Sequence, residues 1–205
     1  MKEKEKHWEI IYETKKLNEV SWFQKKPLTS LSLIESSEIN KSSEIIDIGC
    51  GKSFLIDNLL EKKYSKISLL DISNIALKEV EKRTNNYKNS GKFYNLDILD
   101  FKPNRSFDLW HDRAVFHFLT KKEEINKYVN ICEENINKEG TLIIGTFSEN
   151  GPVKCSGLEI SRYSVKNLQS LFCNSFELVE HLNTNHTTPF ETIQNFNFCK
   201  FKKIK

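Results

Sequence analysis

Length, composition and charge place the chain among ordinary globular domains. It has 205 residues, of which 38% are hydrophobic and 29% charged, enough for one domain with its own core. Basic residues are interspersed with acids and leave a formal net charge of +3, which argues against a nucleic-acid partner. No apolar run approaches the roughly 20 residues of a membrane span, so we expect no membrane contact.

The cysteines and the N-terminal residues indicate the compartment. The 5 cysteines are widely spaced and form no CxxC pair, which argues against a metal site and a disulfide framework. The start of the chain, MKEKEKHWEI, is charged and lacks the apolar centre of a secretory signal. We therefore expect reduced thiols, no bound metal, a cytoplasmic location, and a monomer or a weak homo-oligomer.

The first 40 residues differ in pattern from the rest of the chain. Residues 3–18 are expected to form a helix with an apolar stripe that includes Trp8 and Tyr12. Residues 21–27 are expected to form a loop. A short helix should come next, capped by Thr29 or Ser30.

From residue 44 onward, strand and helix patterns alternate. The expected strands are residues 44–49, 66–72, 92–98, 107–112, 141–147, 176–182 and 193–201. The expected helices are residues 53–63, 74–88, 122–137 and 164–172, with caps at Ser73 or Asn74 and at Ser164. This alternation predicts an α/β fold with a seven-stranded, mostly parallel sheet, helices on both faces, and an antiparallel terminal hairpin. Residues 1–205 are expected to form a single domain.

A glycine turn follows the first expected strand. Its residues are Asp47, Ile48, Gly49, Cys50 and Gly51. Two glycines let the backbone turn sharply and approach a ligand closely, and the helix beyond them offers free N–H donors. At the end of this strand, Asp47 can pair with a ligand ammonium group.

Two further acids end the next strands. Asp71 closes the second strand, where a carboxylate suits the two hydroxyls of a ribose. Asp97 closes the third strand and can accept from an adenine amino group, or it can simply cap a turn. Ile72 and Ile98 would supply apolar faces for the ring.

Three nucleotide-binding patterns compete for these residues. A dinucleotide fingerprint requires a third glycine, but Phe54 stands there, and a P-loop requires a leading glycine, but Ile46 stands there. The third pattern is an acid before a short GxG, with further acids after the second and third strands. Here residues 44–205 resemble the class I S-adenosylmethionine methyltransferases. The resemblance implies a Rossmann-like core over residues 41–205 and S-adenosylmethionine as cofactor.

The resemblance also implies a set of cofactor contacts. In the core they are Asp47, Gly49, Cys50, Gly51, Asp71, Ile72, Ser73, Asp97, Ile98 and His111.

After the fourth strand, the segment Asp112-Arg113-Ala114 resembles the Asp-Arg-Gly of thiopurine methyltransferases, with alanine in place of glycine. The N-terminal aromatics also resemble the N-terminal segment of thiopurine and halide/thiol methyltransferases. This implies that residues 1–40 form a lid, with Trp22 and Gln24 over the methionine end of the cofactor. Trp8 and Tyr12 would line the lid on the acceptor side, or would simply pack against the core.

Other acceptor contacts are expected from two loops. Residues 147–158 are punctuated by glycine, as lids often are, and would bring Phe147 and Cys155 to the acceptor. Residues 186–190, between the last two strands, would bring His186 to the acceptor.

The leading hypothesis is methylation of a small thiol, which could be as small as sulfide or methanethiol. Asp112, Arg113 and His111 are the expected catalytic residues, because a nearby cation or a base would raise the thiolate fraction. Residues 49–55 with Tyr64 and the stretch 71–73 also resemble lysine methyltransferases that act on elongation factors. Protein lysine methylation, O-methylation of a small carboxylate, and a non-catalytic cofactor-binding subunit are the alternatives.

Overall fold

A computed structural model describes residues 3–89 and 91–205. One seven-stranded sheet has the order β3-β2-β1-β4-β5-β9-β8. Its strands are β1 (Ile45–Ile48), β2 (Ile67–Asp71), β3 (Phe93–Asn95), β4 (Phe107–Arg113), β5 (Ile136–Phe147), β8 (Phe176–Thr187) and β9 (Ile193–Lys203). The pairs among β1 to β5 are parallel, whereas β9 is antiparallel to both of its neighbours. The predicted fold class is confirmed.

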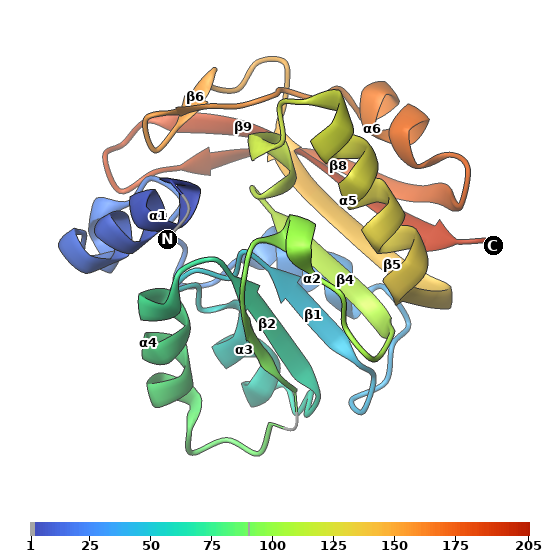
Figure 1. Cartoon of the computed structure of the whole chain (residues 1–205), viewed down its shortest axis with the longest axis horizontal. Coiled ribbons are helices and arrows are strands. Elements are labelled where there is room, and N and C mark those ends of the chain that lie inside the picture. Colours follow the sequence, from blue (N-terminus) through green and yellow to red (C-terminus); the bar gives the residue numbers. More distant parts are fainter. Residues whose placement is uncertain (1–2, 90) are drawn as a thin grey trace.

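Helices cover both faces of this sheet (Figure 1). They are α1 (Glu3–Thr14), α2 (Leu28–Glu35), α3 (Leu55–Glu61), α4 (Asn74–Thr84), α5 (Lys122–Asn135) and α6 (Val165–Phe172). Three short 3₁₀ turns are η1 (Leu17–Glu19), η2 (Ile98–Asp100) and η3 (Phe116–Phe118).

The strand pattern explains why both faces are covered. Successive side chains of a strand point to opposite faces, so Ile46 and Ile48 of β1 join the core under α5 and α6, while Ile45 joins the core under α2, α3 and α4. All of β1 and β2 is buried. Strands that are buried along their whole length and mainly apolar are typical of parallel strands in the middle of a sheet.

Two of the expected helix caps are confirmed. The side chain of Ser73 accepts a hydrogen bond from the Ala76 N–H at the start of α4, and that of Ser164 accepts from the Asn167 N–H at the start of α6. The prediction of a Thr29 or Ser30 cap for α2 is wrong. That helix begins at Leu28 directly after Pro27 and has no side-chain cap.

Several predicted boundaries move. The first helix ends at Thr14, and β3 ends at Asn95, so Asp97 lies beyond it and caps η2. Strand β8 extends to Thr187, which places His186 within the strand rather than in a loop. Residues 147–158 are not wholly loop either, because they contain strand β6 (Lys154–Cys155), which pairs with β7 (Leu158–Glu159).

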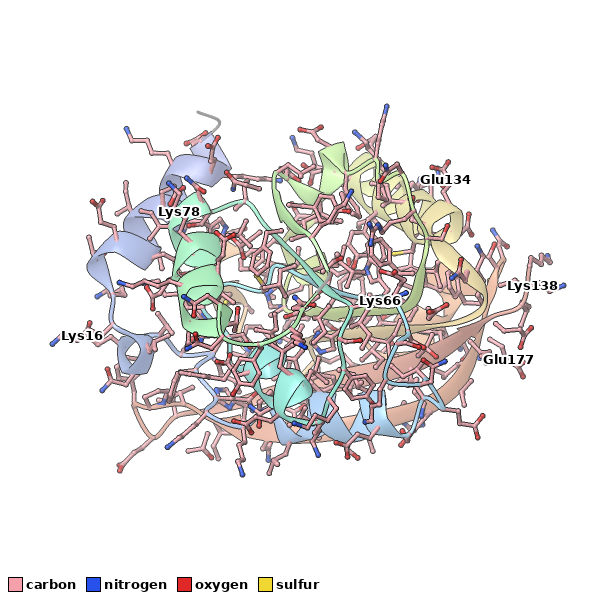
Figure 2. All side chains as sticks on the ribbon, turned by 90° about the horizontal axis from the view of Figure 1, so that it is seen from below. Lys16, Lys66, Lys78, Glu134, Lys138 and Glu177 are labelled. Carbon is pink, nitrogen blue, oxygen red and sulfur yellow. The ribbon has the colours of Figure 1, made fainter. Side chains whose placement is uncertain are left out.

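The surface carries charged side chains of both signs. Lys16, Lys138 and Glu177 are exposed and project from the periphery (Figure 2). In the described parts of the chain, no helix is long and apolar enough to cross a membrane. The same residues contain no cluster of three or more His, Cys, Asp or Glu suited to a metal ion.

Candidate active site

A pocket lies at the carboxyl ends of β1, β2 and β4, the point where the strand order reverses direction. Ligands of open α/β sheets bind at such switch points. The cavity measures about 160 Å³, and α1 lies over this end of the sheet, beside α4 (Figure 1). Most of the predicted site residues line it: Trp8, Tyr12, Trp22, Gln24, Asp47, Gly49, Cys50, Asp71, Ile72, Asp97, Ile98, His111, Arg113 and Cys155.

The turn between β1 and α3 requires its two glycines. Gly49 has φ +60° and Gly51 has φ +51°, a region that side-chain-bearing residues rarely adopt. A Cβ on Gly49 would lie 1.9 Å from Val115 Cγ2, and one on Gly51 would lie 2.3 Å from the Tyr12 hydroxyl oxygen. The glycines therefore allow close approach from both the core and the N-terminal helix.

Asp71 lines the pocket and is 4% exposed. Its carboxylate accepts hydrogen bonds from the backbone N–H of Gly51, at 2.7 Å, and of Ser73, at 2.8 Å. Burial raises the pKa of Asp71 to about 6, although these two hydrogen bonds oppose the shift. Gly51 and Ser73 do not line the pocket and act instead by fixing this acid.

Asp97 and Ile98 form the edge of the pocket at η2. One oxygen of the Asp97 carboxylate accepts from the Leu99 N–H at 2.9 Å. The turn-capping interpretation of Asp97 thus describes its local structure. The carboxylate remains part of the pocket wall.

His111 is held between two partners. Its Nδ1 lies 2.7 Å from Asp47 Oδ1, and its Nε2 lies 2.9 Å from the hydroxyl oxygen of Ser30 on α2. The imidazole is only 2% exposed. With a carboxylate partner Nδ1 donates, so a neutral ring accepts from Ser30 at Nε2. Both ring nitrogens of His111 are thus engaged by protein groups, and its expected role as a base stays a prediction.

Arg113 lines the pocket. Its Nη1 donates to the carbonyl oxygen of Trp22 at 3.0 Å, and the guanidinium carbon lies 5.4 Å from the centre of the Phe196 ring. Its Nη2 is shielded from solvent and has no hydrogen-bond partner. Burial lowers the pKa of Arg113 to about 10, so it remains a cation at neutral pH.

Three further predicted residues lie outside the pocket. Asp112 points to the opposite face of β4, where it accepts from the N–H groups of Val115 and Phe116 and from the Tyr128 hydroxyl. The expected catalytic role of Asp112 is thus corrected to a structural one. Phe147 is buried against Phe196 and His117, and His186 Nε2 lies 2.7 Å from the Ser21 carbonyl oxygen. Phe147 and His186 were expected to line the cavity, but neither of them does.

The N-terminal helix is fastened over the pocket by Glu9. The Glu9 carboxylate accepts from the Ser73 hydroxyl and from the Asn74 N–H, both at 2.8 Å, and from the Ile75 N–H at 3.3 Å. An anion at a helix N-terminus satisfies free backbone donors and the helix dipole. Sequence analysis missed Glu9, because nothing in the local pattern indicates contact with a distant helix end.

Lys52 provides a second attachment for the same helix. Its ammonium group donates to the Tyr12 carbonyl oxygen at 2.8 Å and pairs with Glu79 at 2.6 Å. Above the pocket, Trp8 contacts Trp22 and Phe118 edge-to-face, with ring centres 5.8 and 5.3 Å apart. The roof of the cavity is therefore aromatic.

Comparison with known proteins gives the family. A family model described as a methyltransferase domain matches residues 39–199. The chain belongs to this methyltransferase family. The matched region begins just before β1 and ends in β9, so it contains the glycine turn, the strand-end acids and Arg113.

Two curated relatives are also methyltransferases. The malonyl-[acyl-carrier protein] O-methyltransferase of Acetivibrio thermocellus is 24% identical over 184 residues, which cover 84% of this chain and 61% of that protein. The eEF1A lysine and N-terminal methyltransferase of Mus musculus is 25% identical over 123 residues, covering 58% of this chain and 17% of that protein. This methyltransferase thus spans less than two thirds of either relative.

Solved structures share the fold at low sequence identity. A structure concerned with conversion of a disulfide bond into a thioacetal group during echinomycin biosynthesis has a TM-score of 0.79 and 14% identity, covering 98% of this chain and 93% of that one. The N-methyltransferase NodS from Bradyrhizobium japonicum, in complex with S-adenosyl-L-homocysteine, has a TM-score of 0.69 and 16% identity, covering 87% and 85%.

Proposed function

We propose that this methyltransferase takes its methyl group from S-adenosylmethionine and transfers it to a small acceptor, with a thiol as the preferred acceptor. The pocket residues fit this cofactor. Buried Asp71 suits the two hydroxyls of a ribose, and Asp97 with Ile72 and Ile98 suits an adenine ring with its amino group. Asp47 suits the ammonium group of the amino-acid end.

When bound, the cofactor supplies a methyl group that is already activated by its positive sulfur. The protein must therefore align the donor and the acceptor and exclude water, and it does not need to activate the donor. The glycine turn allows the backbone to approach the ligand, and Trp8, Tyr12 and Trp22 would shield it from above. We propose that residues 1–40 are this lid and that residues 41–205 are the core.

The proposal about the acceptor rests on the two hydrogen-bond contacts of His111. In the described part of the chain, His111 is the one histidine that lines the pocket, and Asp47 and Ser30 occupy both of its nitrogens. An alcohol or a protonated amine needs a base to become a nucleophile. The geometry therefore favours an acceptor that ionises without help from the enzyme.

Thiols meet this condition. A thiol with a pKa of about 8.5 is partly ionised at neutral pH, and its thiolate is a strong nucleophile. The reaction named for the echinomycin structure is also at sulfur, although the proposal rests on the pocket.

Small carboxylates are the second candidate class. They are fully ionised at neutral pH and need no base. The curated relative from Acetivibrio thermocellus is named as an O-methyltransferase. A protein lysine is disfavoured, because its ammonium group must lose a proton and the aromatic roof closes over the cavity.

A matched acceptor panel tests the proposal. Purified protein is incubated with labelled S-adenosylmethionine and with a thiol, a carboxylate or an amine of the same chain length, and formation of the demethylated cofactor is measured. We expect turnover with the thiol, less with the carboxylate and none with the amine. Turnover with the amine alone, or labelled protein bands from a cell lysate in place of labelled small products, would contradict the acceptor assignment.

A further inference from the structure

A cation without a counter-ion borders the acceptor end of the pocket. Arg113 is fixed by the Trp22 carbonyl and the Phe196 ring. None of the ion pairs found within the described residues includes Arg113, and its Nη2 donates no hydrogen bond. The carboxylate whose charge reaches Arg113 is that of Asp47, which is already bound to His111.

The other titratable groups around Arg113 are neutral. Burial raises the pKa of the Cys155 thiol to about 12. Burial, with a contribution from the Arg113 charge, lowers the pKa of His117 to about 3. The same two effects lower the pKa of His186, against the Ser21 hydrogen bond. The charge of Arg113 is thus not balanced from any of these neighbours.

A buried charge of this kind is costly unless a partner is supplied. Arginine is the side chain best suited to hold small oxyanions or thiolates, because it stays protonated and presents several donors in a plane. An ammonium group or a neutral amine at the same place would leave the guanidinium uncompensated. The site therefore discriminates between acceptors by charge.

We propose that the acceptor binds as a small anion, a thiolate or a carboxylate, with Arg113 as its counter-ion. This inference rests on the proposed function. In the transfer, a lone pair of the anion forms the new bond to the methyl carbon, and the electron pair of the old carbon–sulfur bond goes to sulfur. The anion and the sulfonium cation both become neutral, and no proton moves.

The loss of charge on methyl transfer should favour release of the product. The methylated product is a neutral thioether or ester, which Arg113 no longer attracts. The same side chain that selects the acceptor thus favours release of the product. Amine acceptors lack this change, because they bind neutral or positive and leave positive.

Binding measurements without turnover test the inference. Propionate, propanol and propylammonium are titrated into the protein alone and into the protein saturated with S-adenosylhomocysteine, with calorimetry and tryptophan fluorescence as readouts. We expect propionate to bind in both states and at least about tenfold more tightly than the other two. A thiol with a pKa near 8.5 should bind more tightly as the pH rises through that value.

Variants identify the cation. Arg113→Gln should weaken propionate binding by about tenfold or more, and Arg113→Lys should retain part of it. Arg105→Gln is the matched control, because Arg105 pairs with Glu44 and does not line the pocket. Circular dichroism and S-adenosylhomocysteine binding verify that each variant folds.

Two results would overturn the inference: equal affinity for propionate and propanol, or unchanged propionate affinity in both Arg113 variants. Propionate binding by a protein that takes up no S-adenosylhomocysteine would support the anion site and contradict the proposed function. The two failures are therefore distinguishable.

Discussion

We expect the buried carboxylate of Asp71 to make cofactor binding depend on pH. Its pKa is raised to about 6, so the group gains a proton as the pH falls below that value. A protonated carboxyl group accepts hydrogen bonds from ligand hydroxyls less well than a carboxylate does.

We therefore expect affinity for S-adenosylhomocysteine to fall by about tenfold per pH unit below about 6. Calorimetric titrations at pH values on both sides of this pKa measure the change. Asp71→Asn should bind weakly at every pH. An affinity of the wild type that stays constant down to about pH 4.5 would contradict this role of Asp71.

We expect Ser30 to hold His111 in place rather than to take part in a proton-transfer step. Ser30→Ala removes the hydrogen bond to His111 Nε2 in a buried position and should lower the free energy of unfolding by about 1 kcal/mol. The pH midpoint of thiol methylation should remain unchanged and should follow the pKa of the acceptor thiol.

Chemical denaturation and pH–rate profiles with two thiols of different pKa check both statements. Ser32→Ala is the control, because Ser32 is exposed on the same helix. A midpoint that stays near the ordinary histidine value for both thiols would restore His111 as the base.

Strand alternation explains why only part of the predicted catalytic segment faces the pocket. Sequence analysis placed His111, Asp112 and Arg113 together in the site. All three lie in β4, and successive strand residues point to opposite faces, so at most two could face the pocket. Either His111 and Arg113 or Asp112 alone could face it, and the sequence does not decide between them. Partners such as Ser30 and Tyr128 come from segments that local patterns do not connect.

Among the elements, the N-terminal helix α1 is attached directly to the start of α4 by the Glu9 side chain. Glu9 accepts three hydrogen bonds at the start of α4, one of them from Ser73, whose backbone N–H also binds Asp71. The helix over the pocket and the proposed ribose-binding acid therefore share Ser73.

Glu9→Gln removes the charge and one acceptor, so the lid should open more often. We expect S-adenosylhomocysteine to dissociate about tenfold faster, which corresponds to about 1.4 kcal/mol. Stopped-flow fluorescence of Trp8 and Trp22 measures this rate. Glu13→Gln is the control, because Glu13 is exposed on the same helix. Equal dissociation rates in the two variants would show that Glu9 does not hold α1 over the pocket.

The parts of the fold that sequence predicts well are the buried ones. The apolar runs of β1 and β2 and the serine caps of α4 and α6 have short-range signals. Strand β8 was predicted too short, because it is an edge strand whose residues alternate between buried or half-buried and exposed up to Thr187. Its polar outer positions resemble a loop in sequence.

For the whole molecule, the strand order, the glycine turn and the family match all indicate a methyltransferase domain. The pocket lies at the switch point of a seven-stranded sheet, and the methyltransferase family model covers its glycine turn and strand-end acids but not the N-terminal residues that also line it. A cytoplasmic location and a monomeric or weakly oligomeric state stay predictions.

We propose that this pocket binds S-adenosylmethionine through the strand-end acids. Equilibrium dialysis with labelled S-adenosylmethionine measures it most directly, in the wild-type protein and in the Asp71→Asn variant. We expect one bound molecule per wild-type chain and strongly reduced binding in the variant. Absence of retained label with the folded wild-type protein would show that the pocket does not bind this cofactor.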